Sequence, residues 1–292
     1  TMNRITDIFA GKERTLSFEF FTPKTAPGVV RLDTTIGGIF AALRPDFLSV
    51  TYGAGGSTRT GTTALVEELQ QKRGLPVMHH LTCIGNSRDE LALLLADLKA
   101  RDIRNILALG GDPPAGDTAW APHPQGFRYA SELVALARGQ FGDAFTIGAA
   151  GFPERHPRST GWDDEIRNLK IKMDTGTDFL VTQLFFDPEV YFSYVRRVRE
   201  AGITARIIPG VLPITDYEGL LRFTANCGAS VPEEVHRIFK PVADDPDRTF
   251  ALGVDYAIRQ CRTLLAGGAP GIHFYTANRH EAVVRIAPEL DL

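Results

Sequence analysis

The chain has 292 residues, of which 43% are hydrophobic and 23% are charged, and both values are ordinary for a globular protein. A formal net charge of -3 argues against nucleic acid or an anionic membrane as the main partner, because both favour a basic protein face. Cys83, Cys227 and Cys261 are far apart in the sequence, so we expect reduced thiols in a cytoplasmic protein rather than a disulfide framework.

The N-terminal segment, residues 1–14, lacks the apolar core of a secretory signal, and we expect it to form a helical lead-in. The longest leucine-rich run, residues 90–98, is interrupted by acids and is too short to span a bilayer. These features predict a soluble protein with no membrane partner.

Short apolar runs alternate with longer amphipathic runs along the rest of the chain. Each short run has the length of a buried parallel strand and is followed by a polar or Gly/Pro-rich turn. The longer runs carry the caps, first-turn prolines and terminal glycines of helices. The strand candidates are residues 15–21, 46–52, 76–83, 105–111, 144–150, 178–186, 205–211 and 271–277.

Eight strand–helix units in one chain of this length predict a (β/α)8 TIM barrel, for which about 250 residues are typical. We expect one domain over residues 1–292, with extra helices near 216–226 and 232–240 before the last strand. A doubly wound open sheet is the alternative, although it usually has fewer strands. A barrel would gather its chemistry at the carboxyl ends of the strands and in the loops that follow them.

Glu19 lies among phenylalanines in the first predicted strand. Alternation along the strand directs Leu16, Phe18 and Phe20 toward the helices and Glu19 into the barrel mouth. Burial there favours the protonated form of the carboxyl group, which would make Glu19 a general acid near neutral pH. The alternative is a structural glutamate paired with a buried Arg or Lys.

The loop after the second strand, residues 51–61, is rich in glycine. Gly53-Ala54-Gly55 lacks the third glycine and the later acidic residue of the dinucleotide-binding fingerprint. Glycines would still let the backbone approach a phosphate or a flat ring. An ordinary flexible loop is the other interpretation.

Polar residues follow the third and fourth strands. His79 and His80 face opposite sides of a strand, and His80 does not share a face with Cys83, so the pattern argues against a metal site. It favours His80 as a hydrogen-bonding group in the mouth. Asp112, after two glycines, would be a turn residue or a carboxylate at the barrel mouth.

Three further residues have both a binding and a structural interpretation. Gln183 shares a strand face with Phe185, and its amide could bind the edge of a heterocycle or be satisfied in the core. Arg279 could bind a carboxylate or cap the barrel rim. The helical periodicity around Phe223 indicates a core residue rather than a ligand contact.

Nine motifs, in this order, resemble the methylenetetrahydrofolate reductase family. They run from residue 16 to about 279, so the resemblance covers nearly the whole chain, and its length resembles the bacterial form. The motifs are "SFEFFTPK", "SVTYGAGGST", "HLTC", "NILALGGDPP", "YASELV", "GFPERHP", "NLKIKMDTGTDFLVTQLFFD", "IIPGVLPIT" and "HFYTANR".

The resemblance implies a TIM barrel that binds FAD and forms homo-oligomers. NADH or NADPH would reduce the flavin, and the flavin would then reduce 5,10-methylenetetrahydrofolate to 5-methyltetrahydrofolate. Glu19 matches the family's proton donor, and Asp112 matches the acid beside the flavin and the pterin. Gln183 and Arg279 match folate contacts, and Phe223 matches a ring that stacks on nicotinamide or folate.

The resemblance also implies a set of flavin-binding positions, in which Lys172 would offset the diphosphate charge. These positions are Thr51, Tyr52, Gly53, Ala54, His80, Gly110, Gly111, Asp112, Tyr129, Ala130, Phe152, His156, Glu165, Asn168 and Lys172.

The chain departs from the family pattern at several of these positions. Gly110 stands where the family usually has arginine, and we therefore expect weaker FAD retention than in an arginine-bearing relative. Phe152 replaces a common tyrosine, Glu165 a frequent aspartate, Ile171 a frequent basic residue and Gly219 an occasional glutamine. The alternatives are another flavin-dependent barrel oxidoreductase, such as one resembling proline dehydrogenase, and a non-catalytic, flavin-free scaffold.

Overall fold

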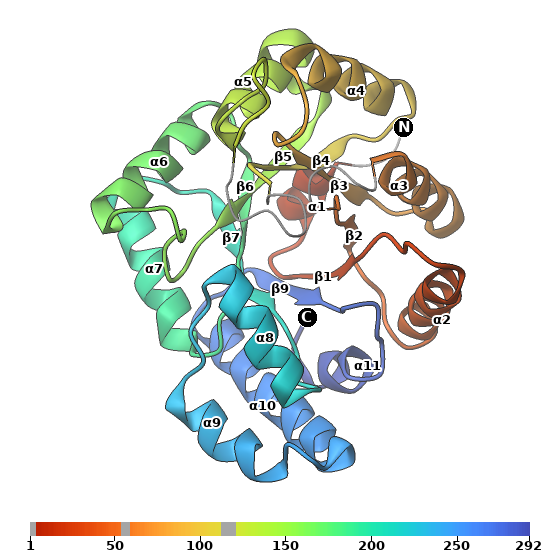
Figure 1. Cartoon of the computed structure of the whole chain (residues 1–292), viewed down its shortest axis with the longest axis vertical. Helices are drawn as coiled ribbons and strands as arrows, with labels where there is room; N and C mark the ends of the chain where they lie inside the picture. The colour runs from red at the N-terminus through yellow and green to blue at the C-terminus, as the bar shows by residue number, and fades with distance from the viewer. Residues whose placement is uncertain (1–3, 54–58, 112–120) are drawn as a thin grey trace.

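The computed structural model describes residues 4–53, 59–111 and 121–292. Within these residues, parallel strands form one nine-stranded sheet in the order β7-β6-β5-β4-β3-β2-β1-β9-β8 (Figure 1). The strands are β1 (Thr15–Phe20), β2 (Phe47–Val50), β3 (Val77–Thr82), β4 (Asn105–Leu109), β5 (Thr146–Gly151), β6 (Phe179–Thr182), β7 (Arg206–Ile208), β8 (Gly210–Val211) and β9 (Gly271–Tyr275).

Strands β7 and β8 are two halves of the seventh predicted strand, interrupted at Pro209. Proline cannot donate a backbone hydrogen bond, which breaks the ladder at that residue. Its carbonyl still accepts the His273 N–H at 3.0 Å. Because β7 pairs with β6 and β8 pairs with β9, this one interrupted strand closes the sheet. The predicted (β/α)8 barrel is therefore confirmed.

Apart from α1, the helices surround the barrel on its outside (Figure 1). The long connection before β9 holds α8, α9 and α10, as the sequence predicts. The helices are α1 (Ile5–Gly11), α2 (Ala26–Ala42), α3 (Arg59–Arg73), α4 (Arg88–Ala100), α5 (Ala130–Phe141), α6 (Trp162–Asp174), α7 (Pro188–Glu200), α8 (Tyr217–Cys227), α9 (Glu233–Phe239), α10 (Pro246–Ala266) and α11 (Val283–Ile286), with short 3-10 turns at Gly142–Ala144, Lys240–Val242 and Ala287–Glu289.

The main hydrophobic core lies between the outer face of the barrel and the helices. Phe18 and Phe20 of β1 are fully buried there, in one cluster with the buried Ile36 and Ile39 of α2. Burying one such side chain stabilises the fold by about 1.5–3 kcal/mol. Strand β1 therefore presents its aromatic residues to the helices and leaves its other face, which carries Glu19, for the interior.

Helix α1 packs at the opposite end of the barrel from the strand carboxyl ends. Ile5 is fully buried in a cluster with Phe47, Met78 and Phe179 inside the barrel. The Phe9 ring lies 5.1 Å from the Phe179 ring, edge to face. The interior is thus filled with apolar side chains at this end, and polar side chains occupy the other.

Asn105 joins α1 to the barrel. Its Oδ1 accepts the Ile5 N–H at 2.8 Å, and Asn105 is fully buried. We expect Asn105→Ala to lower the free energy of unfolding by about 1–3 kcal/mol, because the Ile5 donor would lose its partner. Urea unfolding measures this loss. Thr6→Ala, which removes a part-buried hydroxyl contact with Thr146, serves as the control and should cost less; equal stabilities of wild type and Asn105→Ala would contradict the assignment.

Candidate active site

Glu19 stands at the carboxyl end of β1 and faces the barrel interior. It is only 8% exposed, and the strand register places it beside Ser49 of β2 and Tyr275 of β9. Glu19 Oε2 lies 3.4 Å from His80 Nε2 and 3.6 Å from His273 Nε2. Among the described residues, the basic partners of Glu19 are therefore imidazoles and not the Arg or Lys of the structural alternative.

His273 is held rigidly below Glu19. It is fully buried, its Nδ1 lies 2.8 Å from Ser17 Oγ, and its Nε2 lies 3.3 Å from Ser49 Oγ. Ser17 and Ser49 come from β1 and β2, so neighbouring strands fix the imidazole from two sides. The ring can then keep a constant position relative to the Glu19 carboxyl group.

His80 borders Glu19 on the β3 side. Burial lowers its pKa; the Glu19 charge partly opposes this shift, and His273 adds to it. The imidazole is therefore neutral near pH 7. Within the described part of the chain, His80 Nε2 has no hydrogen-bond partner. A buried polar atom without a partner is costly, so this nitrogen is suited to a ligand.

Tyr275 lies on the other side of Glu19. Its hydroxyl donates a 2.5 Å hydrogen bond to the Thr182 carbonyl, and burial, reinforced by the Glu19 charge, raises its pKa well above the usual value. Tyr275 stays neutral. A Cβ atom at Gly210 would lie 2.5 Å from the Tyr275 hydroxyl, so only glycine leaves room for this ring.

The carboxyl ends of β4 and β5 form the next part of the mouth. Gly111 has φ +86°, and a Cβ atom there would stand 2.4 Å from the Ile84 side chain, so the backbone requires glycine. Lys172 of α6 donates a 2.9 Å hydrogen bond to the Ala150 carbonyl. Burial, partly opposed by Glu165, lowers the Lys172 pKa to about 8, so the amine is still largely protonated at neutral pH.

The loop after β5 is anchored by Glu165 of α6. This buried carboxylate accepts the His156 N–H at 2.9 Å and the Ser159 hydroxyl at 2.5 Å. The Phe152 and His156 rings meet edge to face, with their centroids 4.6 Å apart. Glu165 therefore acts on the mouth through the loop that it holds.

The structure corrects the prediction for the sixth strand. Strand β6 ends at Thr182, four residues earlier than predicted, and Gln183 uses its Oε1 to accept the Leu184 N–H at 2.9 Å. Phe185 is fully buried in the outer core, stacked on Tyr191 at 5.7 Å. Gln183 and Phe185 therefore do not share a strand face, because the chain has already left the sheet.

The side chains of Tyr52 and Phe223 also differ from expectation. The Tyr52 ring is buried on the outer face of the barrel, 5.9 Å from the His79 ring, which leaves only its backbone for the mouth. Phe223 is 45% exposed on α8 and is not the core residue that periodicity predicted. An exposed phenyl ring on a helix that follows the β8 end is available for a ligand.

Most of the other predicted positions lie at strand or helix ends, and Asn168 lies in the middle of α6. The Thr51 carbonyl accepts hydrogen bonds from two threonines, Tyr129 and Ala130 begin α5, Asn168 Nδ2 contacts Asp164 Oδ1 at 3.3 Å, and Arg279 is exposed after β9. Gly53 is the last described residue after β2, and Gly110 directly follows β4. Ala54 and Asp112 lie outside the described residues.

His273, which lies next to Glu19, was missing from the sequence prediction. His273 and Tyr275 lie beside Glu19 only because β1 and β9 pair in register. Alternation along residues 271–275 already places His273 and Tyr275 on one face, opposite Ile272 and Phe274. That pattern, combined with a barrel in which the first and last strands are neighbours, could have identified His273.

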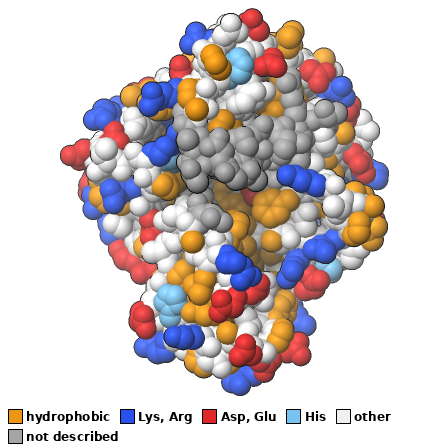
Figure 2. All heavy atoms as spheres, in the orientation of Figure 1, with side chains coloured by type: hydrophobic (Ala, Val, Ile, Leu, Met, Phe, Trp, Pro, Cys, Tyr) orange, Lys and Arg blue, Asp and Glu red, His pale blue; other side chains and the backbone are white. Residues whose placement is uncertain are grey.

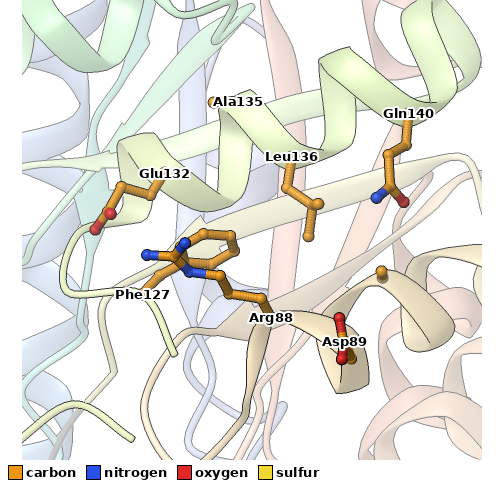
Figure 3. Close-up of a pocket in the computed structure, with 8 residues that line it drawn as sticks. Arg88, Asp89, Phe127, Glu132, Ala135, Leu136 and Gln140 are labelled. Carbon is orange, nitrogen blue, oxygen red and sulfur yellow. The ribbon is translucent and has the colours of Figure 1, made fainter. Parts of the chain in front are cut away.

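A cavity of about 460 Å³ between α4 and α5 does not belong to this site (Figure 3). Two of the charged side chains that line it, Glu132 and Arg88, already contact neighbouring parts of the chain. Glu132 accepts the Arg128 and Tyr129 N–H groups at the start of α5, and the Arg88 guanidinium stacks on the Phe127 ring at 5.2 Å. These contacts make the cavity a groove between helices.

The face that carries the strand carboxyl ends is hollowed near its centre, with hydrophobic side chains inside the hollow and Lys and Arg side chains beside it (Figure 2).

Among the described residues, no cluster of three His, Cys, Asp or Glu side chains could hold a metal ion. Within the same residues, no helix has the length and apolar character needed to cross a membrane.

Comparison with known proteins places these features in a family context. The family model described as methylenetetrahydrofolate reductase matches residues 4–291. Methylenetetrahydrofolate reductase 1 of Schizosaccharomyces pombe is 39% identical over 278 residues, which cover 95% of this chain and 46% of the relative. The 5,10-methylenetetrahydrofolate reductase of Escherichia coli is 35% identical over 266 residues, which cover 91% of this chain and 87% of the relative.

The match differs in extent between kingdoms. The chain spans about half the length of the fungal and plant relatives and most of the length of the bacterial ones. Among solved structures, a Clostridium thermocellum protein described as binding two copies of 5-methyl-5,6,7,8-tetrahydrofolic acid has a TM-score of 0.63 at 16% identity, covering 98% of this chain and 97% of that one. At this identity, the likeness shows the fold alone.

Proposed function

Because the chain belongs to the methylenetetrahydrofolate reductase family, we propose that it reduces 5,10-methylenetetrahydrofolate to 5-methyltetrahydrofolate with NADH or NADPH as hydride donor. The observation that carries this proposal is the buried Glu19 carboxyl group, held beside two imidazoles at the mouth of the barrel. A shielded acid at the open end of a barrel can deliver a proton to a bound heterocycle.

The residues at the mouth also fit FAD, the cofactor that the family resemblance implies. In the described structure, His80 Nε2 and Thr82 Oγ1 are buried without hydrogen-bond partners. Lys172, at the carboxyl end of β5, adds a positive charge suited to a diphosphate. When bound, FAD would accept hydride from the nicotinamide and supply it to the folate.

Glu19 would act on the folate as general acid. Its proton passes to the bridging ring nitrogen that leaves, the bond from that nitrogen to the methylene carbon breaks, and a 5-iminium cation forms. Hydride then adds to the methylene carbon and gives the methyl group. The Glu19 carboxylate that remains would be stabilised by the His273 ring, whose Nε2 atom lies 3.6 Å from Glu19 Oε2.

Gln183, Phe223 and Arg279 would bind the substrates, as the resemblance implies. Gln183 stands half-buried at the end of β6 and offers an amide to a pterin edge. The exposed Phe223 ring can stack on nicotinamide or pterin, and the exposed Arg279 can bind a folate carboxylate.

A pair of half-reactions tests the proposal. Purified protein supplied with FAD should retain flavin absorbance, which NADH or NADPH bleaches and 5,10-methylenetetrahydrofolate restores, with 5-methyltetrahydrofolate as product. Protein that retains no flavin and is inert to both substrates would support the scaffold alternative. Flavin that bleaches with nicotinamide but does not recover with the folate would instead indicate another flavin-dependent oxidoreductase.

A further inference from the structure

Arg158 lies against Gly110, which follows β4 at the barrel mouth. The Arg158 Nη2 atom is 3.6 Å from the point where a Cβ atom on Gly110 would stand. This is an ordinary van der Waals distance, so the absence of a side chain at position 110 leaves the guanidinium next to bare backbone. The guanidinium therefore comes from the loop after β5 and reaches the end of the neighbouring strand, β4.

The loop that carries Arg158 is held on both sides. The Arg158 N–H donates to His156 Nδ1 at 3.0 Å, and the adjacent Ser159 hydroxyl donates to the buried Glu165 carboxylate. Glu154 Oε1, at the other end of the loop, accepts the Ser230 N–H at 3.0 Å. These contacts fix the backbone from which the Arg158 side chain extends, and they reduce the entropy that an exposed arginine would lose on binding a ligand.

A second cation lies at the neighbouring strand end. Strands β4 and β5 pair side by side, with Ala108 opposite Ala149, and Lys172 donates to the Ala150 carbonyl at the end of β5. Arg158 beside Gly110 and Lys172 beside Ala150 thus bring two positive groups to adjacent strand ends. Such a pair favours an anionic ligand, and guanidinium matches phosphate oxygens through a planar, bidentate fork.

We propose that Arg158 is a cofactor-binding residue whose guanidinium contacts the diphosphate of FAD over Gly110. This inference rests on the proposed function, because it requires the barrel mouth to hold FAD. It changes the consequence of Gly110: the arginine that the family usually places at that position is replaced in this chain by one from the next loop. We therefore expect FAD retention similar to that of an arginine-bearing relative, in place of the weaker retention expected from Gly110 alone.

The test measures the dissociation constant of FAD by flavin fluorescence with apo-protein. Arg158→Ala should raise it roughly 10- to 100-fold, the effect of losing a hydrogen bond to a charged group. The dissociation constant of Arg158→Lys should lie between those of wild type and Arg158→Ala, because lysine keeps the charge but lacks the planar guanidinium. Arg155→Ala is the matched control: Arg155 is an exposed arginine of the same loop, and its removal should change the constant less than twofold.

A transplanted arginine and a truncated ligand make the test specific. Gly110→Arg in the Arg158→Ala background should recover at least tenfold of the lost affinity, because it returns a guanidinium to the same space. Riboflavin, which has no phosphate, should bind wild type and Arg158→Ala equally. The difference in FAD dissociation constant between wild type and Arg158→Ala should shrink as the salt concentration rises from 50 to 500 mM. Arg158 is exposed, and salt screens exposed charges, with a Debye length of about 10 Å at 0.1 M.

Wild-type affinity for FAD in both Arg158→Ala and Arg158→Lys would overturn the inference and leave the proposed function intact. An equal loss in Arg155→Ala, or an equal loss for riboflavin, would also overturn it. Failure of the wild type itself to bind FAD would refute the proposed function and this inference together. Thermal unfolding of each variant shows whether the fold is retained. If Arg158→Ala is unfolded, the FAD dissociation constant of Arg158→Gln is measured in its place, with the same expected result.

Discussion

Replacing Glu19 with glutamine should lower the rate of methylenetetrahydrofolate reduction by about 10²- to 10⁴-fold, while bleaching of the flavin by NADH stays near the wild-type rate. Glutamine fills the same volume beside His80 and His273 but has no acidic proton to give. Hydride uptake from nicotinamide needs no proton from this residue. Stopped-flow absorbance, recorded separately for the two half-reactions, measures both rates.

A loss of the same size in both half-reactions would contradict the general-acid assignment and indicate that Glu19 supports the structure of the mouth. Glu281→Gln is the matched control, because that carboxylate is 60% exposed, far more than Glu19, and should leave both rates unchanged. Glu19→Asp adds a graded test. It keeps an acid but withdraws it by one methylene group, so folate reduction should fall less than in Glu19→Gln.

The barrel was predictable because the alternation of apolar and polar residues within each strand shows which face packs against the helices. In β1, the alternation of Phe18 and Phe20 with Glu19 separates the helix-facing side from the interior, and the structure follows it. The same alternation in β3 puts His79 outside and His80 inside, as expected. Burial of apolar side chains fixes these faces locally, so no knowledge of the partner strands is needed.

Features that depend on partner strands were not predictable in the same way. Phe185 continues an apolar run, yet the chain leaves the sheet after Thr182, because Phe185 is buried against Tyr191 outside the barrel. His273 reaches Glu19 only through the pairing of β1 with β9, residues more than 250 positions apart. The approach of the Arg158 guanidinium to Gly110 brings two loops together, and neither loop sequence predicts it.

Acid should destabilise the protein strongly below pH 6.5 because of His79. This imidazole is fully buried behind the mouth, with its Nε2 3.1 Å from Thr63 Oγ1. Burial, aided by the nearby His80, lowers its pKa to about 3. The His79 imidazole takes up a proton near pH 6.5 in the unfolded chain but only near pH 3 in the folded protein. The free energy of unfolding therefore falls as the pH is lowered from 6.5 toward 3.

Each pH unit in that window should therefore cost about 1.4 kcal/mol through His79 alone, and His80, whose pKa is also lowered by burial, adds to the loss. Urea unfolding at pH 7.5, 6 and 5 measures the slope. In His79→Gln, an amide can keep the bond to Thr63 but cannot titrate, so its stability should fall less steeply between pH 6 and 5, by up to about 1.4 kcal/mol. Wild type and variant share every other titrating group; parallel curves would therefore mean that His79 is already protonated in the folded protein or neutral in both states.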